Sequence, residues 1–430
     1  MIKLKLKIRT IIALLSILTP ALFLTSSTNA YKVESFPTPN PSTLAGGLTI
    51  SSDGSIWFIK PEQRKVVKSD KLGNMTEYVI PQIDQLTPDS YVGFGSMAAD
   101  DSSNILFTSN DRGPAQTNRS GYIRRVTSEG QINATLVTIP ETTTNTSITP
   151  SRMGLFGIKY IGNDTYWLTG GSLEDGYTIA MKVDLDGQVL SYWESAIEEG
   201  GPIASVMDQN KNLWIALKGK LVKITLDGQG NSIQLNNMSN IIALESDSNN
   251  DIWVVPWSQD YSNTTTPIAK INSATNNGVS YFQFPEGKTA VPLQAISKGP
   301  DGNIWISTMN SSDQSPLRGL ALSRLSLAGI LSETDILNSN QVATSIKLDK
   351  NNILWALTSN VDPDSDEGLV ANSVKLIKIS PDATVIVNPR PPKTGNTAIF
   401  ILITSLVLSS VLLFSSYIHQ KHIKTIATTK

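Results

Sequence analysis

The chain lacks cysteine altogether, and its only two histidines, His419 and His422, lie within the last dozen residues. Without cysteine the protein has no disulfide, no thiolate metal site and no cysteine nucleophile. Without histidine, the body of the chain has no histidine-based triad and no imidazole base or metal ligand. Charged residues make up only 17% of the chain, and the net charge of −2 gives no basic surface for nucleic acid.

The amino terminus has the pattern of a secretory signal peptide over residues 1–30. A cationic start precedes an apolar run at residues 11–24, and a small-residue cleavage site ends at Ala30. An uncleaved anchor helix is the alternative, and Pro20 within the apolar run argues against it. We therefore expect export of the chain.

The carboxyl terminus has the pattern of a membrane anchor. Residues 397–418 carry no charge and are long enough to span about 30 Å of hydrocarbon as a transmembrane helix. The tail at residues 419–430 is basic, which predicts a cytoplasmic location for it. Residues 31–394 would then lie on the extracellular face, with 28 basic and 37 acidic residues and a net charge of −9. An acidic ectodomain of this kind is not expected to bind nucleic acid.

A proline-rich spacer at residues 389–396 precedes the anchor and contains a second targeting pattern. Its residues Pro392, Lys393, Thr394 and Gly395 resemble the sorting signal of bacterial cell-wall proteins, in which an apolar helix and a basic tail follow. The resemblance implies a sortase partner, cleavage after Thr394 and attachment to the cell wall. Pro391 stands where that signal has leucine, so an ordinary juxtamembrane spacer is the alternative.

The segment between these ends is an internal repeat. An aromatic residue recurs after a turn rich in Asp, Gly and Asn, at intervals of 39 to 60 residues: Trp57, Phe107, Trp167, Trp214, Trp253, Trp305 and Trp355. In four repeats an Asp stands six residues earlier: Asp101, Asp208, Asp247 and Asp349. Because these turn residues tolerate positive φ, we interpret them as hairpin turns rather than metal ligands.

Each repeat has a second half with its own pattern. A basic residue between apolar neighbours leads into a turn that usually contains glycine; the seven basic residues are Lys68, Arg125, Lys182, Lys223, Lys270, Arg324 and Lys378. One basic residue per repeat could form a ring for an anion, but we expect hydrogen bonds at strand edges and ion pairs between repeats. The tryptophans are expected in the core.

Two hairpins per repeat make a four-stranded sheet, and seven such sheets predict an all-β, seven-bladed β-propeller over residues 31–388. No blade could bury both of its faces alone, so neighbouring blades must supply the core. Residues 31–38 look like an outer strand without a blade of its own. We expect this strand to join the seventh blade and close the ring, although residues 384–388 could compete for that place.

The recurring unit, with Asp-Gly-x-Ile-Trp in the first half and Ile-x-(Arg/Lys)-(Ile/Val)-x-x-x-Gly in the second, resembles the blade of the streptogramin B (virginiamycin B) lyase family. It also shares features with gluconolactonase-like propellers. The resemblance covers about residues 31–389 and implies seven blades, a magnesium ion and a histidine general base with acidic partners on one face of the ring. The propeller contains no histidine, so this catalytic residue has no counterpart here.

Propellers usually bind ligands at an end of the central channel, where the innermost strands begin. By register these entries lie near residues 44–46, Phe94, Phe156, Pro202, Ile241, Gln294 and Thr344. Of these, Phe94, Phe156 and Gln294 are our candidate ligand-binding residues, together with Trp257, which falls outside the repeat. These positions are mostly apolar or small, which suits binding better than acid–base catalysis.

One acidic segment interrupts the repeat. Its residues Asp362, Asp364 and Asp366 resemble the start of a calcium-binding loop, with oxygen ligands at alternating positions. Glu367 stands where that loop needs glycine, so we expect a solvated acidic loop, with a weak calcium site as the alternative.

The sequence predicts a surface-anchored extracellular propeller that binds a protein or a glycan, with no cofactor. The alternative is a divergent lyase or lactonase-like enzyme that uses carboxylates and a divalent cation, Mg²⁺ or Ca²⁺. Carboxylates from different blades converging at one channel mouth would favour the enzyme. An apolar or scattered channel mouth would favour the binding module.

Overall fold

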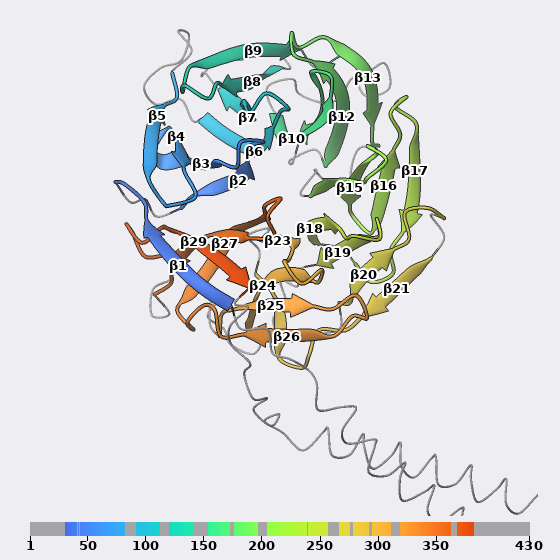
Figure 1. Ribbon diagram of the computed structural model, residues 1–430. Helices are drawn as coiled ribbons and strands as arrows, with labels where there is room; N and C mark the ends of the chain where they lie inside the picture. Colours follow the sequence, from blue (N-terminus) through green and yellow to red (C-terminus); the bar gives the residue numbers. More distant parts are fainter. Residues whose placement is uncertain are drawn as a thin grey trace, which may run out of the picture. The chain divides into compact units, whose positions relative to one another are not determined.

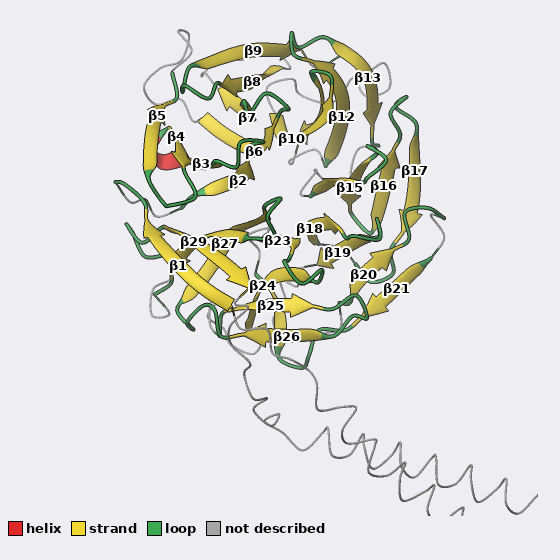
Figure 2. Cartoon of the chain, viewed as in Figure 1, coloured by secondary structure: helices red, strands yellow, loops and turns green. Residues whose placement is uncertain are grey.

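The computed structural model describes residues 31–381, except 41, 43, 82–91, 112–119, 139, 141–153, 173–175, 197–203, 239, 257–265, 276–277, 292–294, 311–318 and 363–367. Residues Tyr31–Pro381 form one compact unit. Figure 1 shows this unit as a ring of sheets, and Figure 2 shows that the regular structure of its described residues consists of strands apart from one short 3-10 helix, η1 (Pro61–Gln63).

Seven antiparallel sheets occur among the described residues, as predicted for a seven-bladed propeller. From the inner to the outer strand, the first three blades contain β2 (Gly46–Ile50), β3 (Ile56–Lys60), β4 (Lys65–Ser69) and β5 (Met75–Val79); β6 (Val92–Ala99), β7 (Ile105–Asp111), β8 (Ser120–Val126) and β9 (Ile132–Thr138); and β10 (Gly154–Gly162), β11 (Thr165–Ser172), β12 (Tyr177–Asp184) and β13 (Val189–Glu194).

The next three blades follow the same order. They contain β14 (Ser205–Met207), β15 (Leu213–Leu217), β16 (Lys220–Ile224) and β17 (Gly230–Gln234); β18 (Ile241–Ser246), β19 (Ile252–Pro256), β20 (Ile268–Ile271) and β21 (Val279–Phe282); and β22 (Lys288–Ala290), β23 (Ile296–Lys298), β24 (Ile304–Asn310), β25 (Ala321–Leu325) and β26 (Leu331–Thr334). In the sixth blade the inner strand is split, because β22 and β23 both pair with β24.

The seventh blade joins the two ends of the ring. Its inner strands are β27 (Gln341–Leu348), β28 (Leu354–Asn360) and β29 (Lys375–Pro381), and β1 (Tyr31–Pro37) pairs antiparallel with β29 as the outer strand. Seven residue pairs run from Tyr31 opposite Pro381 to Pro37 opposite Lys375. The first strand of the propeller therefore completes the last blade. The competing residues 384–388 lie outside the described residues.

Tryptophan fills the space between neighbouring blades. Trp57, for example, is fully buried in a cluster with Met97 and Ile105 of the second blade. The other five repeat tryptophans are also among the largest fully buried side chains: Trp167, Trp214, Trp253, Trp305 and Trp355. The prediction that these residues form the core is confirmed. Since a buried aromatic ring removes a large apolar area from water, each one contributes strongly to blade association.

The second blade departs from the predicted register by one residue. In the other blades the tryptophan pairs with the basic residue of the next strand, as Trp214 does with Lys223. In the second blade Leu106 pairs with Arg125, and Leu106 packs toward the third blade. Phe107 faces back into the cluster that contains Trp57. Assigning Phe107 to the repeat position was wrong, because the leucine takes that position and alternation turns its neighbour to the opposite face.

The turn aspartates organise their hairpins, as predicted. The Asp208 carboxylate accepts backbone hydrogen bonds from Asn210 and Asn212 at 2.9 Å, and it also accepts one from Trp214 Nε1 at 3.0 Å. The carboxylates of Asp247 and Asp349 likewise accept a hydrogen bond from the tryptophan Nε1 of their own blade. In the second blade this role belongs to Asp100 rather than to Asp101, in agreement with the one-residue shift.

The repeated basic residues connect the blades through hydrogen bonds. Lys223 Nζ lies 5.3 Å from the centre of the Trp214 ring and donates to the Ser273 carbonyl of the next blade at 2.9 Å. Among the described residues, the ion pairs of the repeated basic residues lie within a blade, as between Arg125 and Asp100 at 3.3 Å. Ion pairs between blades stay a prediction.

Among the described residues, no helix is long and apolar enough to cross a membrane. The predicted signal peptide at 1–30, the spacer at 389–396, the transmembrane helix at 397–418 and the tail at 419–430 lie outside the described residues.

Candidate binding site in the central channel

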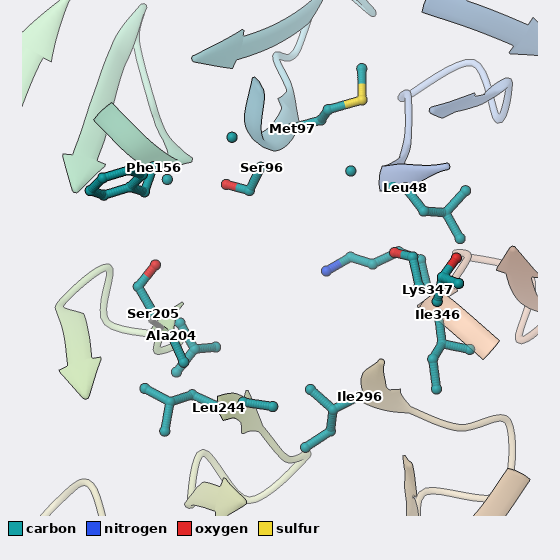
Figure 3. Close-up of a pocket in the computed structure, with 18 of the residues that line it drawn as sticks. Leu48, Ser96, Met97, Phe156, Ala204, Ser205, Leu244, Ile296, Ile346 and Lys347 are labelled. Atoms are coloured by element: carbon teal, nitrogen blue, oxygen red, sulfur yellow. The ribbon is translucent and has the colours of Figure 1, made fainter. Parts of the chain in front are cut away.

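A pocket of about 750 Å³ lies on the axis of the ring and is lined by the inner strands of all seven blades. One lining residue from each blade illustrates its symmetry: Gly46, Gly95, Phe156, Ala204, Ala243, Ile296 and Thr344. A cavity of this size fits a small organic molecule or a short segment of a larger partner. Figure 3 shows the side chains that point into it.

The wall of the channel is mixed, because apolar and polar atoms expose similar areas to the cavity. Leu48, Met97, Leu244, Ile296 and Ile346 come from five different blades and lie around the opening in Figure 3, and most of each side chain is buried in the clusters between the blades. In a wall of this kind the polar groups orient a ligand and the apolar atoms pack against it.

Glycines allow neighbouring inner strands to approach closely at the channel. A Cβ atom added at Gly95 would lie 2.1 Å from Thr108 Oγ1 and 2.4 Å from the Phe156 carbonyl oxygen. At Gly157 it would lie 2.3 Å from Thr169 Oγ1. Register shifts in β6 and β10 fall beside these glycines. Such bulges redirect side chains at the edge of a strand, and here they shape the pocket wall between the second, third and fourth blades.

Three ionisable residues occupy equivalent positions in the inner strands. Lys159, Glu245 and Lys347 each line the pocket and each pair with the tryptophan of their own blade. They belong to the third, fifth and seventh blades. Lys159 and Glu245 are half-buried, and Lys347 is exposed. Figure 3 shows the Lys347 amine extending toward the middle of the channel.

These charges influence one another. The pKa of Lys159 is lowered to about 8, mainly because burial disfavours its charged form; the charge of Lys347 also lowers it, whereas Glu245 raises it. One Glu245 carboxylate oxygen accepts a hydrogen bond from the backbone N–H of Ser246 at 3.0 Å. The pocket therefore holds two cationic groups and one carboxylate within a wall of mixed polarity.

These three residues are not among the candidates predicted above, although the sequence carries their signal. Each stands eight residues before the tryptophan of its blade, and the same spacing gives Thr49, Val206 and Ser297 in other blades. Reading this position around the ring would have located all three charges. The channel mouth was expected to be mostly apolar or small, with few groups for acid–base catalysis. The structure adds two lysines and a glutamate to it.

The structure places the predicted ligand-binding residues unevenly. Phe156 lines the pocket, and Phe94 lies on β6 opposite Ser109. Trp257 and Gln294 lie outside the described residues. Binding by any of these four residues stays a prediction.

Of the acidic segment, only Asp362 is described. It is exposed, and its backbone N–H donates to the Gly368 carbonyl at 2.9 Å. Asp364 and Asp366 fall outside the described residues, as do Pro392, Lys393, Thr394 and Gly395 of the sorting pattern.

The described part of the channel does not fit a magnesium ion. Mg²⁺ needs oxygen ligands in an octahedral arrangement, and Glu245 is the one carboxylate among the described lining residues. Lys159 and Lys347 share its level of the channel and would repel a cation. In the described ranges no group of three or more His, Cys, Asp or Glu side chains is placed to hold a metal.

The fold and this pocket define a seven-bladed β-propeller with an axial cavity, and solved structures of the same fold are known. A streptogramin B lyase structure is 17% identical with a TM-score of 0.56, over 83% of this chain and 99% of that one. Virginiamycin B lyase from Staphylococcus aureus, in selenomethionine form, gives the same identity and TM-score over 82% and 99%.

A third similar structure is the extracellular domain of a putative hybrid two-component system from B. thetaiotaomicron. It is 14% identical with a TM-score of 0.54, over 85% of this chain and 45% of that one. No family model and no curated protein matches the sequence. At these identities the likeness establishes a shared fold, including the fold of the streptogramin B lyases, and nothing about activity.

Proposed function

We propose that this protein is an extracellular binding module that holds a group of a protein or glycan partner in its central channel. The observation that carries the proposal is the axial pocket of about 750 Å³, which all seven blades line. Its mixture of apolar atoms, hydroxyls and a few charged groups suits a binding pocket, in which polar groups fix the orientation of a ligand. Phe94, Phe156, Trp257 and Gln294 are the proposed aromatic and polar contacts.

We propose a location at the cell surface. Residues 1–30 would direct export, residues 397–418 would form a single membrane span, and residues 419–430 would remain in the cytoplasm. Cleavage of the sorting pattern after Thr394 by a sortase would attach the propeller to the cell wall of a bacterium. The extracellular domain with the same fold supports an outside location.

A divergent lyase or lactonase-like enzyme with Mg²⁺ or Ca²⁺ is the competing function. The lyases of the same fold favour it, whereas the cationic channel disfavours a bound metal ion. A thermal-shift titration of the full-length chain with Mg²⁺, Ca²⁺ and EDTA separates the two functions. A ligand that binds only the folded state raises its apparent stability. We expect no saturable shift, and a saturable shift with one cation would favour the enzyme.

The binding function is tested by screening the full-length chain against glycan arrays and displayed peptides. Each partner is then measured against two variants that introduce the same residue at different places. Ser205→Trp places an indole at the pocket wall, where Ser205 of the fourth blade lines the cavity beside the third blade (Figure 3). Leu136→Trp places it on the outer strand β9, where the side chain is already half exposed.

We expect Ser205→Trp to abolish partner binding and Leu136→Trp to leave it unchanged, with both variants keeping the wild-type melting temperature. Partner binding that survives in a folded Ser205→Trp variant would contradict a site in the channel. A loss in both variants would place the site elsewhere.

A further inference from the structure

The charges in the channel point to the chemistry of the ligand, on the condition that the channel is the binding site proposed above. Three of seven equivalent inner-strand positions are charged, and their charges sum to one positive unit: Lys159, Glu245 and Lys347. The predicted ectodomain is acidic, with a net charge of −9. The net charge of the channel residues is therefore positive, whereas the net charge of the domain is negative. This local positive charge favours the binding of an anion.

The channel lysines lack the partners that the buried Lys60 has. Lys60 is fully buried, and its amine donates to the Asn40 carbonyl at 2.8 Å and to Glu77. Within the described residues, Lys159 and Lys347 make no hydrogen bond or ion pair. Burial is the main cause of the lowered pKa of Lys159, and the positive charge of Lys347 lowers it further by repulsion. An anion between them would relieve this repulsion and gain charge-assisted hydrogen bonds.

The walls limit what the anion can be. Met97, Leu244 and Ile346 contribute apolar atoms to the same cavity, and such atoms make up about half of its wall, so part of the remainder of the ligand meets apolar surface. A single negative charge matches the net charge of the three residues, whereas Glu245 would repel a second one. We propose that the channel binds a carboxylate carried on an apolar group, with the carboxylate between Lys159 and Lys347.

Isothermal titration of the full-length chain with hexanoate tests this proposal directly. Hexanamide has the same apolar chain without the charge, and inorganic phosphate has the charge without the chain. The titrations are run at about pH 6.5, where Lys159 is protonated. We expect hexanoate to bind and hexanamide and phosphate to bind at least about tenfold more weakly, because charge-assisted hydrogen bonds and apolar contacts both contribute.

Charge variants give results of opposite sign. Lys347→Gln, at an exposed position, is expected to weaken hexanoate binding about tenfold to a hundredfold, and Lys159→Gln is expected to do the same. Glu245→Gln removes the competing carboxylate and is expected to strengthen binding. Lys71→Gln, in an exposed turn of the first blade, is the control and should change nothing.

Equal binding of hexanoate and hexanamide would overturn the proposal, and so would unchanged affinity in a folded Lys347→Gln variant. Phosphate binding without hexanoate binding would also overturn it, because the ligand would then be a different anion. If hexanoate fails while a screened partner is still lost in Ser205→Trp, the carboxylate proposal fails and the channel site stands. If hexanoate binds but every screened partner still binds the Ser205→Trp variant, the carboxylate proposal stands and the proposed binding of a protein or glycan in the channel fails.

Discussion

Removing the charge of Glu77 is expected to destabilise the closure of the ring. Lys60 is fully buried at the end of β3, and its amine donates to the carbonyls of Pro39 and Asn40 as well as to Glu77. Lys65 forms a second ion pair with Glu77 at 2.5 Å. This cluster fixes the segment that leads from the closing strand β1 into the first blade.

The magnitude follows from the burial of these groups. Glu77→Gln keeps the shape of the side chain but leaves the Lys60 charge without its counter-ion, which costs about 3 kcal/mol for a buried pair. For a propeller of this length, about 2.1 cal/mol/K per residue converts this loss into a drop of about 4 °C in melting temperature. Glu34→Gln is the control, because its ion pair with Lys378 is exposed to solvent and contributes little to stability.

The pH dependence identifies the cause of the loss. The pKa of Glu77 is lowered, since burial alone would raise it but the hydrogen bonds from Lys60, Lys65 and Asn40 outweigh that effect. The stabilisation by Glu77 is therefore complete above its unfolded pKa of about 4.3 and disappears as the pH falls through the lower, folded value. Differential scanning calorimetry should show the full difference between wild type and Glu77→Gln at neutral pH and a shrinking one in acid. An equal difference at every pH would refute this explanation.

Two further predictions concern the repeat itself. Gly130 has φ of +86°, and an added Cβ atom would lie 1.9 Å from the Tyr78 ring of the neighbouring blade. Gly130→Ala should therefore lower the free energy of unfolding by about 2 kcal/mol in chemical denaturation. A loss no larger than that of Gly46→Ala would contradict the role of this contact. Trp57 Nε1 has no acceptor among the described residues, and Ser51 stands where other blades have aspartate. The double variant Ser51→Asp/Asp53→Asn should gain about 1 kcal/mol, and an unchanged or lower denaturant midpoint would argue against the missing acceptor.

The fold was largely predictable because every blade repeats the same pattern of two hairpins in one four-stranded sheet. The turn, the tryptophan and the basic residue recur in the same order, since the turn aspartate holds its own hairpin and the tryptophan packs between neighbouring blades. The error at Phe107 arose because an aromatic residue stands beside the true repeat position. There Leu106 does the packing, and only the strand pairing distinguishes the two.

The site was less predictable because its residues break the repeat. Lys159, Glu245 and Lys347 occupy a position that is neutral in the other blades, so a search for what the blades share passes over them. Their shared location also depends on ring closure, which brings blades far apart in the sequence around one axis. The influence of Lys347 on the pKa of Lys159 joins positions 188 residues apart, and no local pattern reports such a distance.

The most direct test of the channel as the binding site is lysine acylation followed by mass spectrometry, with and without the partner found by screening. Lys347 is exposed within the channel, whereas Lys71 is exposed on an outer turn. We predict that the partner slows acylation of Lys347 and leaves that of Lys71 unchanged. An unchanged rate at Lys347 under saturating partner would show that the partner binds outside the channel.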